Sequence, residues 1–130
     1  MIEYPTVDKI VEFNLLALNL IKVKKADSPY VLSRTKISDV IESCKTAKGD
    51  LYEKAAAILK GLVQAHAFAS GNRRTAFIAV KYFLLKNNKK IGVADEPQNA
   101  KVLLGIRENY YSSKEIKEWL KNGKIREFKR

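Results

Sequence analysis

The sequence predicts an all-α protein, a helical bundle around a buried central helix with a short flap or hairpin before the core. Apolar residues recur every three to four positions through most of the chain, which is the period of an amphipathic helix. Residues 76–85, AFIAVKYFLL, are apolar apart from Lys81, and a helix that is apolar all round is typical of a buried position. At 130 residues the chain has the length of one domain, so residues 1–130 are expected to form a single one.

The N-terminal part is expected to hold a helix, the flap and a second, shorter helix. Residues 6–24 carry the helical period, and Pro5 is a suitable residue at its start. Residues 26–34, ADSPYVLSR, break the period because a turn-forming Asp-Ser-Pro run is followed by β-prone Tyr-Val-Leu, so they predict the flap. The short helix follows over residues 38–47 and ends before Gly49.

The main helix is expected over residues 51–69, which are rich in the strong helix formers Ala and Leu. Asp50 is placed to cap this helix, with Glu53 as the reciprocal partner of a capping box. The pair Ser70 and Gly71 then interrupts the helical pattern.

A second long helix is expected over residues 73–88, with Asn72 as its N-cap. Two shorter helices follow, one over residues 97–107 and a last one that Ser112 caps. The basic stretch 114–130 at the end of the chain is open to two interpretations, a tail that binds a partner or a solvated amphipathic helix.

The composition favours acidic partners and excludes two kinds of site. The chain has 25 Lys and Arg against 14 Asp and Glu, a net charge of +11. A charge of this sign attracts nucleic acid, nucleotides or an acidic protein. The alternative is a soluble, Lys-rich surface without a specific partner. Its single cysteine, Cys44, is expected to be a small buried residue and rules out an internal disulfide and a Cys/His zinc site. No stretch approaches the ~18 apolar residues of a membrane helix, and the start lacks a basic signal region, so we expect a cytoplasmic protein without membrane contact.

Residues 66–77, HAFASGNRRTAF, suit chemistry on a phosphate. They hold the only histidine of the chain, His66, which four residues separate from Gly71. An imidazole can accept a hydroxyl proton at neutral pH, and a helix N-terminus opened by glycine can bind an anion. Arg73 and Arg74 add directed donors for phosphate oxygens. The residues alone also allow a second interpretation, in which His66 is structural and the segment is a joint between two helices.

The pattern His66-x-Phe68-x-x-Gly71-Asn72-x-Arg74 resembles the signature of the Fic/Doc (Fido) family, which runs His-x-Phe-x-Asp/Glu-Gly-Asn-Gly/Lys-Arg. The resemblance is strongest over residues 50–88, where a long helix precedes the pattern and an apolar helix follows it. It implies a mostly helical Fido domain and a transferase that uses ATP as its substrate.

The resemblance also implies a role for each residue of the pattern. His66 is the catalytic base that activates a hydroxyl of a target protein, and Phe68 packs into the core and fixes the loop. Arg74 clamps phosphate oxygens and is the second catalytic residue. The residues expected to bind the nucleotide phosphates are Ser70, Gly71, Asn72, Arg73 and Arg74. The flap is expected to align the target segment as an added strand.

Two positions favour the death-on-curing (Doc) branch of this family. Arg73 stands where Fic proteins usually have Gly and Doc-like proteins have Lys, and Phe77 stands where many AMP-transferring members carry a further Arg. The Doc branch implies a toxin-type kinase that phosphorylates elongation factor Tu or a similar translation factor and is paired with an antitoxin. Transfer of AMP is the less favoured reaction.

Ser70 departs from the family pattern, because it replaces the acidic residue that holds Mg²⁺ against the phosphates. We therefore assign no metal ligand, and Mg²⁺ could be held only by phosphates and water. The alternative function is a catalytically weak or degenerate Fido-fold module whose basic surface binds nucleic acid or an acidic antitoxin. Ser38-x-x-x-Glu42 is similar to the family's inhibitory motif, but Ser43 follows in place of Gly or Asn, so we interpret it as coincidence and expect control by a partner.

Overall fold

The computed structural model describes residues 1–21 and 31–129, and the regular elements of this part of the chain are six α-helices. They are α1 (Val7–Ile21), α2 (Arg34–Thr46), α3 (Leu51–Ala65), α4 (Asn72–Lys86), α5 (Asn99–Arg107) and α6 (Ser113–Asn122). No strand forms among the described residues, where an isolated antiparallel bridge joins Val31 to Phe68. The predicted all-α class is therefore confirmed.

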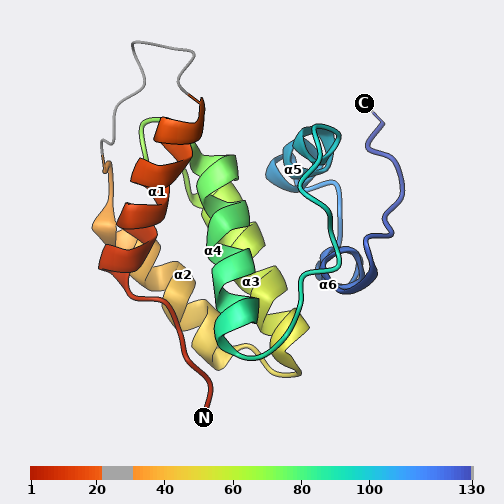
Figure 1. The fold of residues 1–130 in the computed structure, drawn as a ribbon, viewed down its shortest axis with the longest axis horizontal. Coiled ribbons are helices and arrows are strands. Elements are labelled where there is room, and N and C mark those ends of the chain that lie inside the picture. The colour runs from red at the N-terminus through yellow and green to blue at the C-terminus, as the bar shows by residue number, and fades with distance from the viewer. Residues whose placement is uncertain (22–30, 130) are drawn as a thin grey trace.

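Helices α3 and α4 form the centre of the bundle (Figure 1). Helix α3 packs against α2, α4, α5 and α6, and α4 also packs against α1. In Figure 1, α1 and α2 lie on one side of the central pair, and α5 and α6 lie on the other. The sequence predicts that residues 73–88 form the central, buried helix. In the structure α4 shares this position with α3, because Lys81 and Leu85 of α4 are exposed, whereas α3 exposes only Gln64.

The core draws on all six of these helices and on the segment before α4. The largest fully buried side chains are Ile10, Ile37, Ile58, Leu59, Phe68, Phe83, Leu84, Ile106, Ile116 and Leu120. Cys44 is buried as expected, and burial raises the pKa of its thiol to about 11, so the thiol is protonated and unreactive at neutral pH.

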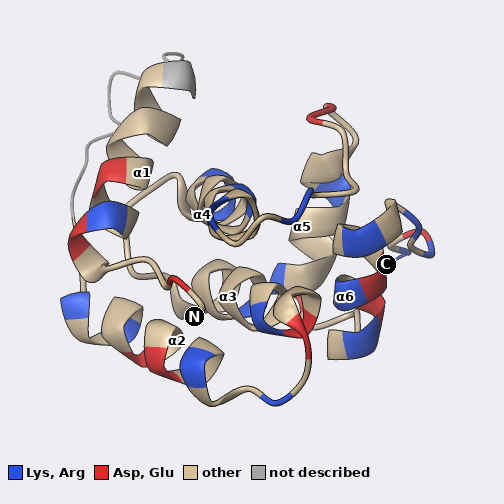
Figure 2. Cartoon of the chain, turned by 60° about the horizontal axis from the view of Figure 1, so that its bottom comes forward, with Lys and Arg blue, Asp and Glu red and all other residues tan. Residues whose placement is uncertain are grey.

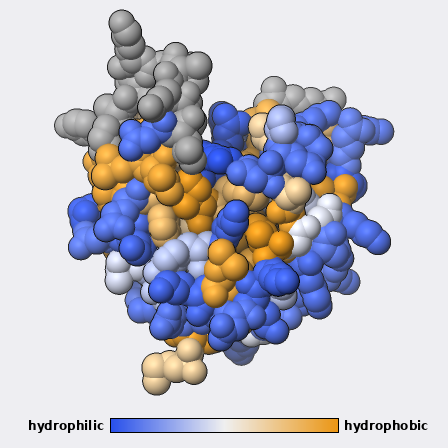
Figure 3. Space-filling view, in the orientation of Figure 1, coloured by the Kyte–Doolittle hydropathy of each residue, from blue (hydrophilic) through white to orange (hydrophobic). Residues whose placement is uncertain are grey.

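The surface carries its cations on several helices rather than in one block (Figure 2). An apolar area lies over α1 (Figure 3), where Leu15 and Leu16 are exposed. None of the helices in the described part of the chain is long and apolar enough to span a membrane.

Two helix boundaries lie four residues from their predicted positions. Helix α2 begins at Arg34, four residues early, because Ser33 Oγ accepts a hydrogen bond from the Lys36 backbone N–H at 3.1 Å and so acts as the N-cap. Helix α3 ends at Ala65 instead of residue 69, because His66 adopts the left-handed conformation with φ of 52°.

The capping box predicted at Asp50 forms only in part. Asp50 Oδ1 accepts a hydrogen bond from the Glu53 backbone N–H at 3.0 Å, but the Glu53 carboxylate accepts one from Lys117 Nζ of α6, also at 3.0 Å. Ser112 and Glu115 exchange both bonds of a capping box at the start of α6. A distant lysine therefore competes with the local cap of α3, which local sequence reasoning does not reveal.

A buried lysine joins α2 to α3. Lys54 is only 8% exposed, and its Nζ donates hydrogen bonds to the backbone carbonyls of Cys44, Lys45 and Ala47 at 3.3, 3.1 and 2.8 Å. These carbonyls lie in the last turn and C-cap of α2, where the Cys44 carbonyl also accepts a hydrogen bond from the Ala47 N–H, and a cation at this end suits the helix dipole. Lys54 therefore fixes the end of α2 against the start of α3.

We expect Lys54→Met to lower the free energy of unfolding by about 2–3 kcal/mol, because methionine retains the apolar stem and leaves the carbonyls of Lys45 and Ala47 without their donor and that of Cys44 with the Ala47 N–H alone. Urea unfolding followed by circular dichroism measures this change. Lys60→Met on the same helix is the matched control and should change the free energy by less than about 0.5 kcal/mol. Equal losses in the two variants would contradict a capping role for Lys54.

Candidate active site

The turn between α3 and α4, residues 66–71, carries the predicted site. His66 is the C-cap of α3 in the left-handed conformation, with φ of 52° and ψ of 49°, and its side chain is exposed. Gly71 has φ of 76°, which favours glycine, and is the N-cap of α4. A Cβ at Gly71 would lie 3.2 Å from both Asn14 Nδ2 and Leu18 Cδ2 of α1. Glycine thus allows both the conformation of the turn and its close approach to α1.

Asn72 holds the turn in shape, and it does so as the first residue of α4 rather than as the predicted N-cap. Its Oδ1 accepts a hydrogen bond from the Phe68 backbone N–H at 3.0 Å, and its Nδ2 donates one to the Phe68 carbonyl at 2.9 Å. Both backbone groups of Phe68 are thereby satisfied outside any helix. The Phe68 side chain is 1% exposed, so it anchors the turn in the core, in keeping with the role that the resemblance implies.

Asn14 of α1 supports the turn from the core side. It is 1% exposed, and its Nδ2 donates hydrogen bonds to the Ser70 carbonyl at 3.0 Å and to Thr75 Oγ1 at 3.1 Å. Asn14 Oδ1 and Ser70 Oγ are buried atoms without a hydrogen-bond partner among the described residues. Sequence reasoning missed Asn14, although an amide within an apolar helical pattern is a signal, because a buried polar group requires partners.

The end of the predicted flap runs beside the turn. The backbone N–H groups of Leu32 and Ser33 both donate to the Ala67 carbonyl, at 2.8 and 3.2 Å. Residues 26–30, the remainder of the flap, lie outside the described residues. The expected alignment of a target segment along the flap therefore stays a prediction.

The turn forms part of the wall of a pocket of about 860 Å³, which α5 and residues 95–97 complete. All the residues predicted to be catalytic or to bind phosphate line this pocket, namely His66, Ser70, Gly71, Asn72, Arg73 and Arg74. The structure adds Asp95, Glu96 and Arg107, which the sequence analysis missed. These three residues are far from the turn along the chain, and no local pattern connects them with it.

Positive charge predominates in the pocket. Three guanidinium groups line it, from Arg73, Arg74 and Arg107, against the two carboxylates of Asp95 and Glu96. The N-terminus of α4 also borders the pocket, and the N–H groups of a first helical turn lack intrahelical acceptors and attract anions. The pocket therefore suits a ligand that carries several negative charges.

Arg74 is held by a carboxylate inside the pocket. Its Nη1 and Nη2 donate hydrogen bonds to Oδ1 and Oδ2 of Asp95, at 2.9 and 3.2 Å. These hydrogen bonds are the main cause that lowers the pKa of the Asp95 carboxyl, so Asp95 is charged at neutral pH. The side chains of Arg74 and Asp95 are 34% and 51% exposed, so a dissolved ligand can reach both.

The pocket does not supply the carboxylate with which the family holds Mg²⁺. The corresponding position is Ser70, a neutral residue with a buried hydroxyl. Asp95 is paired with Arg74, and Glu96 accepts a hydrogen bond from Gln98. Within residues 1–21 and 31–129, no group of three or more His, Cys, Asp or Glu could hold a metal ion. The residues present do not fit a protein-held Mg²⁺, and we assign no chemical step to one.

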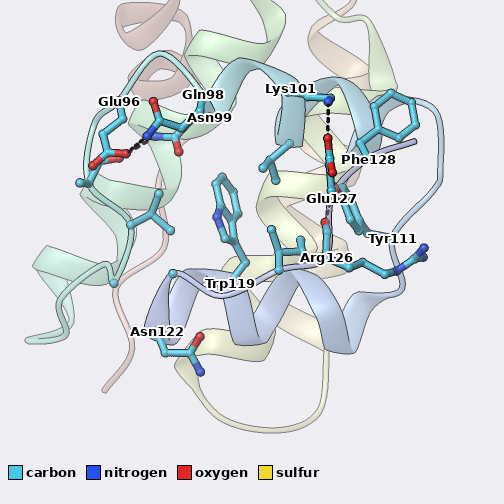
Figure 4. Close-up of a pocket in the computed structure, with 16 residues that line it drawn as sticks. Glu96, Gln98, Asn99, Lys101, Tyr111, Trp119, Asn122, Arg126, Glu127 and Phe128 are labelled. Carbon is cyan, nitrogen blue, oxygen red and sulfur yellow. Dashed lines mark hydrogen bonds and ion pairs between the residues drawn. The ribbon is translucent and has the colours of Figure 1, made fainter. Parts of the chain in front are cut away.

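A second pocket, of about 550 Å³, lies between α5, α6 and the C-terminal segment (Figure 4). No residue of the segment 66–77 lines it, and two of its charged groups, Lys101 and Glu127, form an ion pair at 2.9 Å. Glu96 and Asn99 line both pockets and so form a shared wall. The pocket at the turn, which gathers the residues of the motif, is the candidate active site.

Residues 22–84 match the model of the Fic/DOC family. This range includes α2, α3, the turn and most of α4, and it contains the whole segment 66–77. A search of curated proteins finds no match to the chain. The family model thus covers the part of the chain in which the motif residues were identified.

We expect Asn72→Ala to lower the free energy of unfolding by about 1–3 kcal/mol, because both backbone groups of the buried Phe68 lose their partner. Urea unfolding measures this loss. Asn72→Asp is the matched control, since it retains the acceptor for the Phe68 N–H and lacks the donor for the carbonyl, so its stability should be intermediate. If Asn72→Ala is as stable as the wild type, the turn does not depend on this side chain.

Proposed function

Because residues 22–84 match the model of the Fic/DOC family, we propose that the chain is a transferase that moves the γ-phosphoryl group of ATP to a hydroxyl of a target protein. The observation that carries this proposal is the shared pocket, in which His66 lies with the N-terminus of α4 and Arg74. A base and an anion-binding site within one pocket are the minimum that phosphoryl transfer to a hydroxyl requires.

His66 acts as the general base in the proposed reaction. The target hydroxyl oxygen forms a bond to the γ-phosphorus, and the bond from the γ-phosphorus to the β–γ bridging oxygen breaks. ADP leaves with that electron pair, and the imidazole takes the hydroxyl proton. The exposure of His66 in the pocket supports this role, because a protein hydroxyl must approach it from solvent.

The phosphates bind at the N-terminus of α4. Main-chain N–H groups of Gly71, Asn72 and Arg73 donate hydrogen bonds to them, and the Arg74 guanidinium holds further phosphate oxygens. The left-handed Gly71 supports this assignment, because it brings the start of α4 to the pocket wall in a conformation that favours glycine. Ser70 lines the same pocket at the position of the family's acidic residue, and its hydroxyl is buried.

We favour phosphoryl transfer over AMP transfer because of two residues. Arg73 places a long cation at the start of α4, and Phe77, which lines the pocket at 4% exposure, supplies no charge where AMP-transferring relatives carry Arg. The proposal extends to the Doc branch, with a cytoplasmic translation factor similar to elongation factor Tu as target and an acidic antitoxin as partner. The net charge of +11 supports an acidic partner.

A second candidate function is a binding module of the same fold without catalysis, which holds nucleic acid or an acidic antitoxin. Ser70 favours it, since Mg²⁺ at phosphates usually requires one or two carboxylates. Lys and Arg are spread over several helices (Figure 2), which supplies a general attraction for polyanions, so this function ranks second.

We expect the purified protein to transfer label from γ-labelled ATP, and not from α-labelled ATP, to elongation factor Tu. His66→Ala should slow this transfer by at least about 100-fold, because the variant lacks the general base. The affinity for ATP, measured by calorimetry, is the control and should change little, since the imidazole does not hold the phosphates. Equal rates in the variant and the wild type would contradict the assigned mechanism.

We expect Ser70→Asp to raise the affinity for ATP when Mg²⁺ is present and to lower it when Mg²⁺ is absent, because a carboxylate attracts the cation and repels bare phosphates. Ser70→Asn has a similar shape without the charge and should show neither effect. Calorimetric titrations with and without Mg²⁺ measure the difference. A protein that binds no ATP in any of the three forms would support the second candidate function instead.

A further inference from the structure

The two terminal nitrogens of Arg74, which lines the pocket, form a fork that the carboxylate of Asp95 occupies. Both terminal nitrogens of the guanidinium donate to the carboxylate, one to each oxygen, at 2.9 and 3.2 Å. A phosphate group accepts hydrogen bonds from arginine in the same two-bond arrangement. In this structure the carboxylate thus takes the place that the proposed function gives to a phosphate.

The position of Asp95 allows it to leave this fork. It belongs to the segment between α4 and α5, outside any helix, and 51% of its side chain is exposed. Among the described residues, the hydrogen-bond partner of the Asp95 carboxylate is Arg74. The pair uses two of the five N–H donors of the guanidinium group. Release of Asp95 into water therefore disturbs no part of the core.

We propose that Asp95 is a specificity-determining residue that competes with the anionic ligand for Arg74, so that a phosphate engages this guanidinium only by displacing the carboxylate. The inference rests on the proposed function in one respect, the role of Arg74 as a phosphate ligand. A ligand that also binds the N-terminus of α4 can displace Asp95, whereas a weakly charged anion cannot. The competition thus selects ligands with several phosphates.

This contact differs from the motif at Ser38 and Glu42. Glu42 lies on α2, where it pairs with Lys45 at 3.7 Å, and it does not line the pocket. The acidic side chain that contacts the proposed phosphate-binding Arg74 is Asp95, from the segment between α4 and α5.

Asp95→Asn tests the competition, and Glu96→Gln is its matched control. Both variants remove one negative charge from the lining of the same pocket, but Glu96 contacts Gln98 and not Arg74. We expect Asp95→Asn to tighten the binding of inorganic tripolyphosphate about threefold to fivefold, which is the range for loss of a half-exposed ion pair. Glu96→Gln should change the affinity for tripolyphosphate by less than about twofold. Calorimetry at constant ionic strength measures both affinities.

The same titration in an Arg74→Ala background isolates the contact. In that background, Asp95→Asn should give no gain in affinity for tripolyphosphate, because the guanidinium group for which the two anions compete is absent. An equal gain with Glu96→Gln, a gain that persists without Arg74, or weaker binding by Asp95→Asn would each overturn the inference. The probe is an inorganic anion, and the experiment measures no transfer. A protein without transferase activity would therefore contradict the proposed function, while this test of the competition would still apply.

Discussion

The two hydrogen bonds between the Asn72 side chain and the backbone of Phe68 are the constraint on which the site depends. Phe68 is buried in the core, so these bonds set the end of α3 and the start of α4 in one arrangement. His66 stands at the first of these helix ends and Arg74 close to the second. Because a general base acts only within hydrogen-bond reach of its proton, this short turn connects the packing of the bundle with the proposed chemistry.

The electrostatics of the pocket follow from the same arrangement. The turn exposes the positive end of α4 where Arg73 and Arg74 begin the helix, and α5 adds Arg107 from across the pocket. With a serine at position 70, these guanidinium groups and the helix end are the principal counter-charges for the polyphosphate that we propose as ligand. Asp95 reduces their attraction while the pocket holds no anion, since it neutralises Arg74.

The helices were predictable because apolar period and Ala/Leu content are local properties of the sequence, whereas the details of the turn were not. Asn72 was expected to cap its own helix, but the same amide can also clamp a neighbouring loop, and only the burial of Phe68 selects the second use. The left-handed conformation of His66, which ends α3 early, was also unexpected, because residues other than glycine rarely adopt it. Asp95 and Arg107 were missed because nothing local indicates that α5 packs across from the turn.

The most direct test of the central claim, that the turn before α4 is a phosphate site, is a crystal structure of the full chain with a non-hydrolysable ATP analogue. The account predicts phosphate oxygens within hydrogen-bond distance of the backbone N–H groups at the start of α4, with Arg74 turned from Asp95 to the nucleotide. An analogue bound in the second pocket (Figure 4), with the Arg74–Asp95 pair intact, would contradict it.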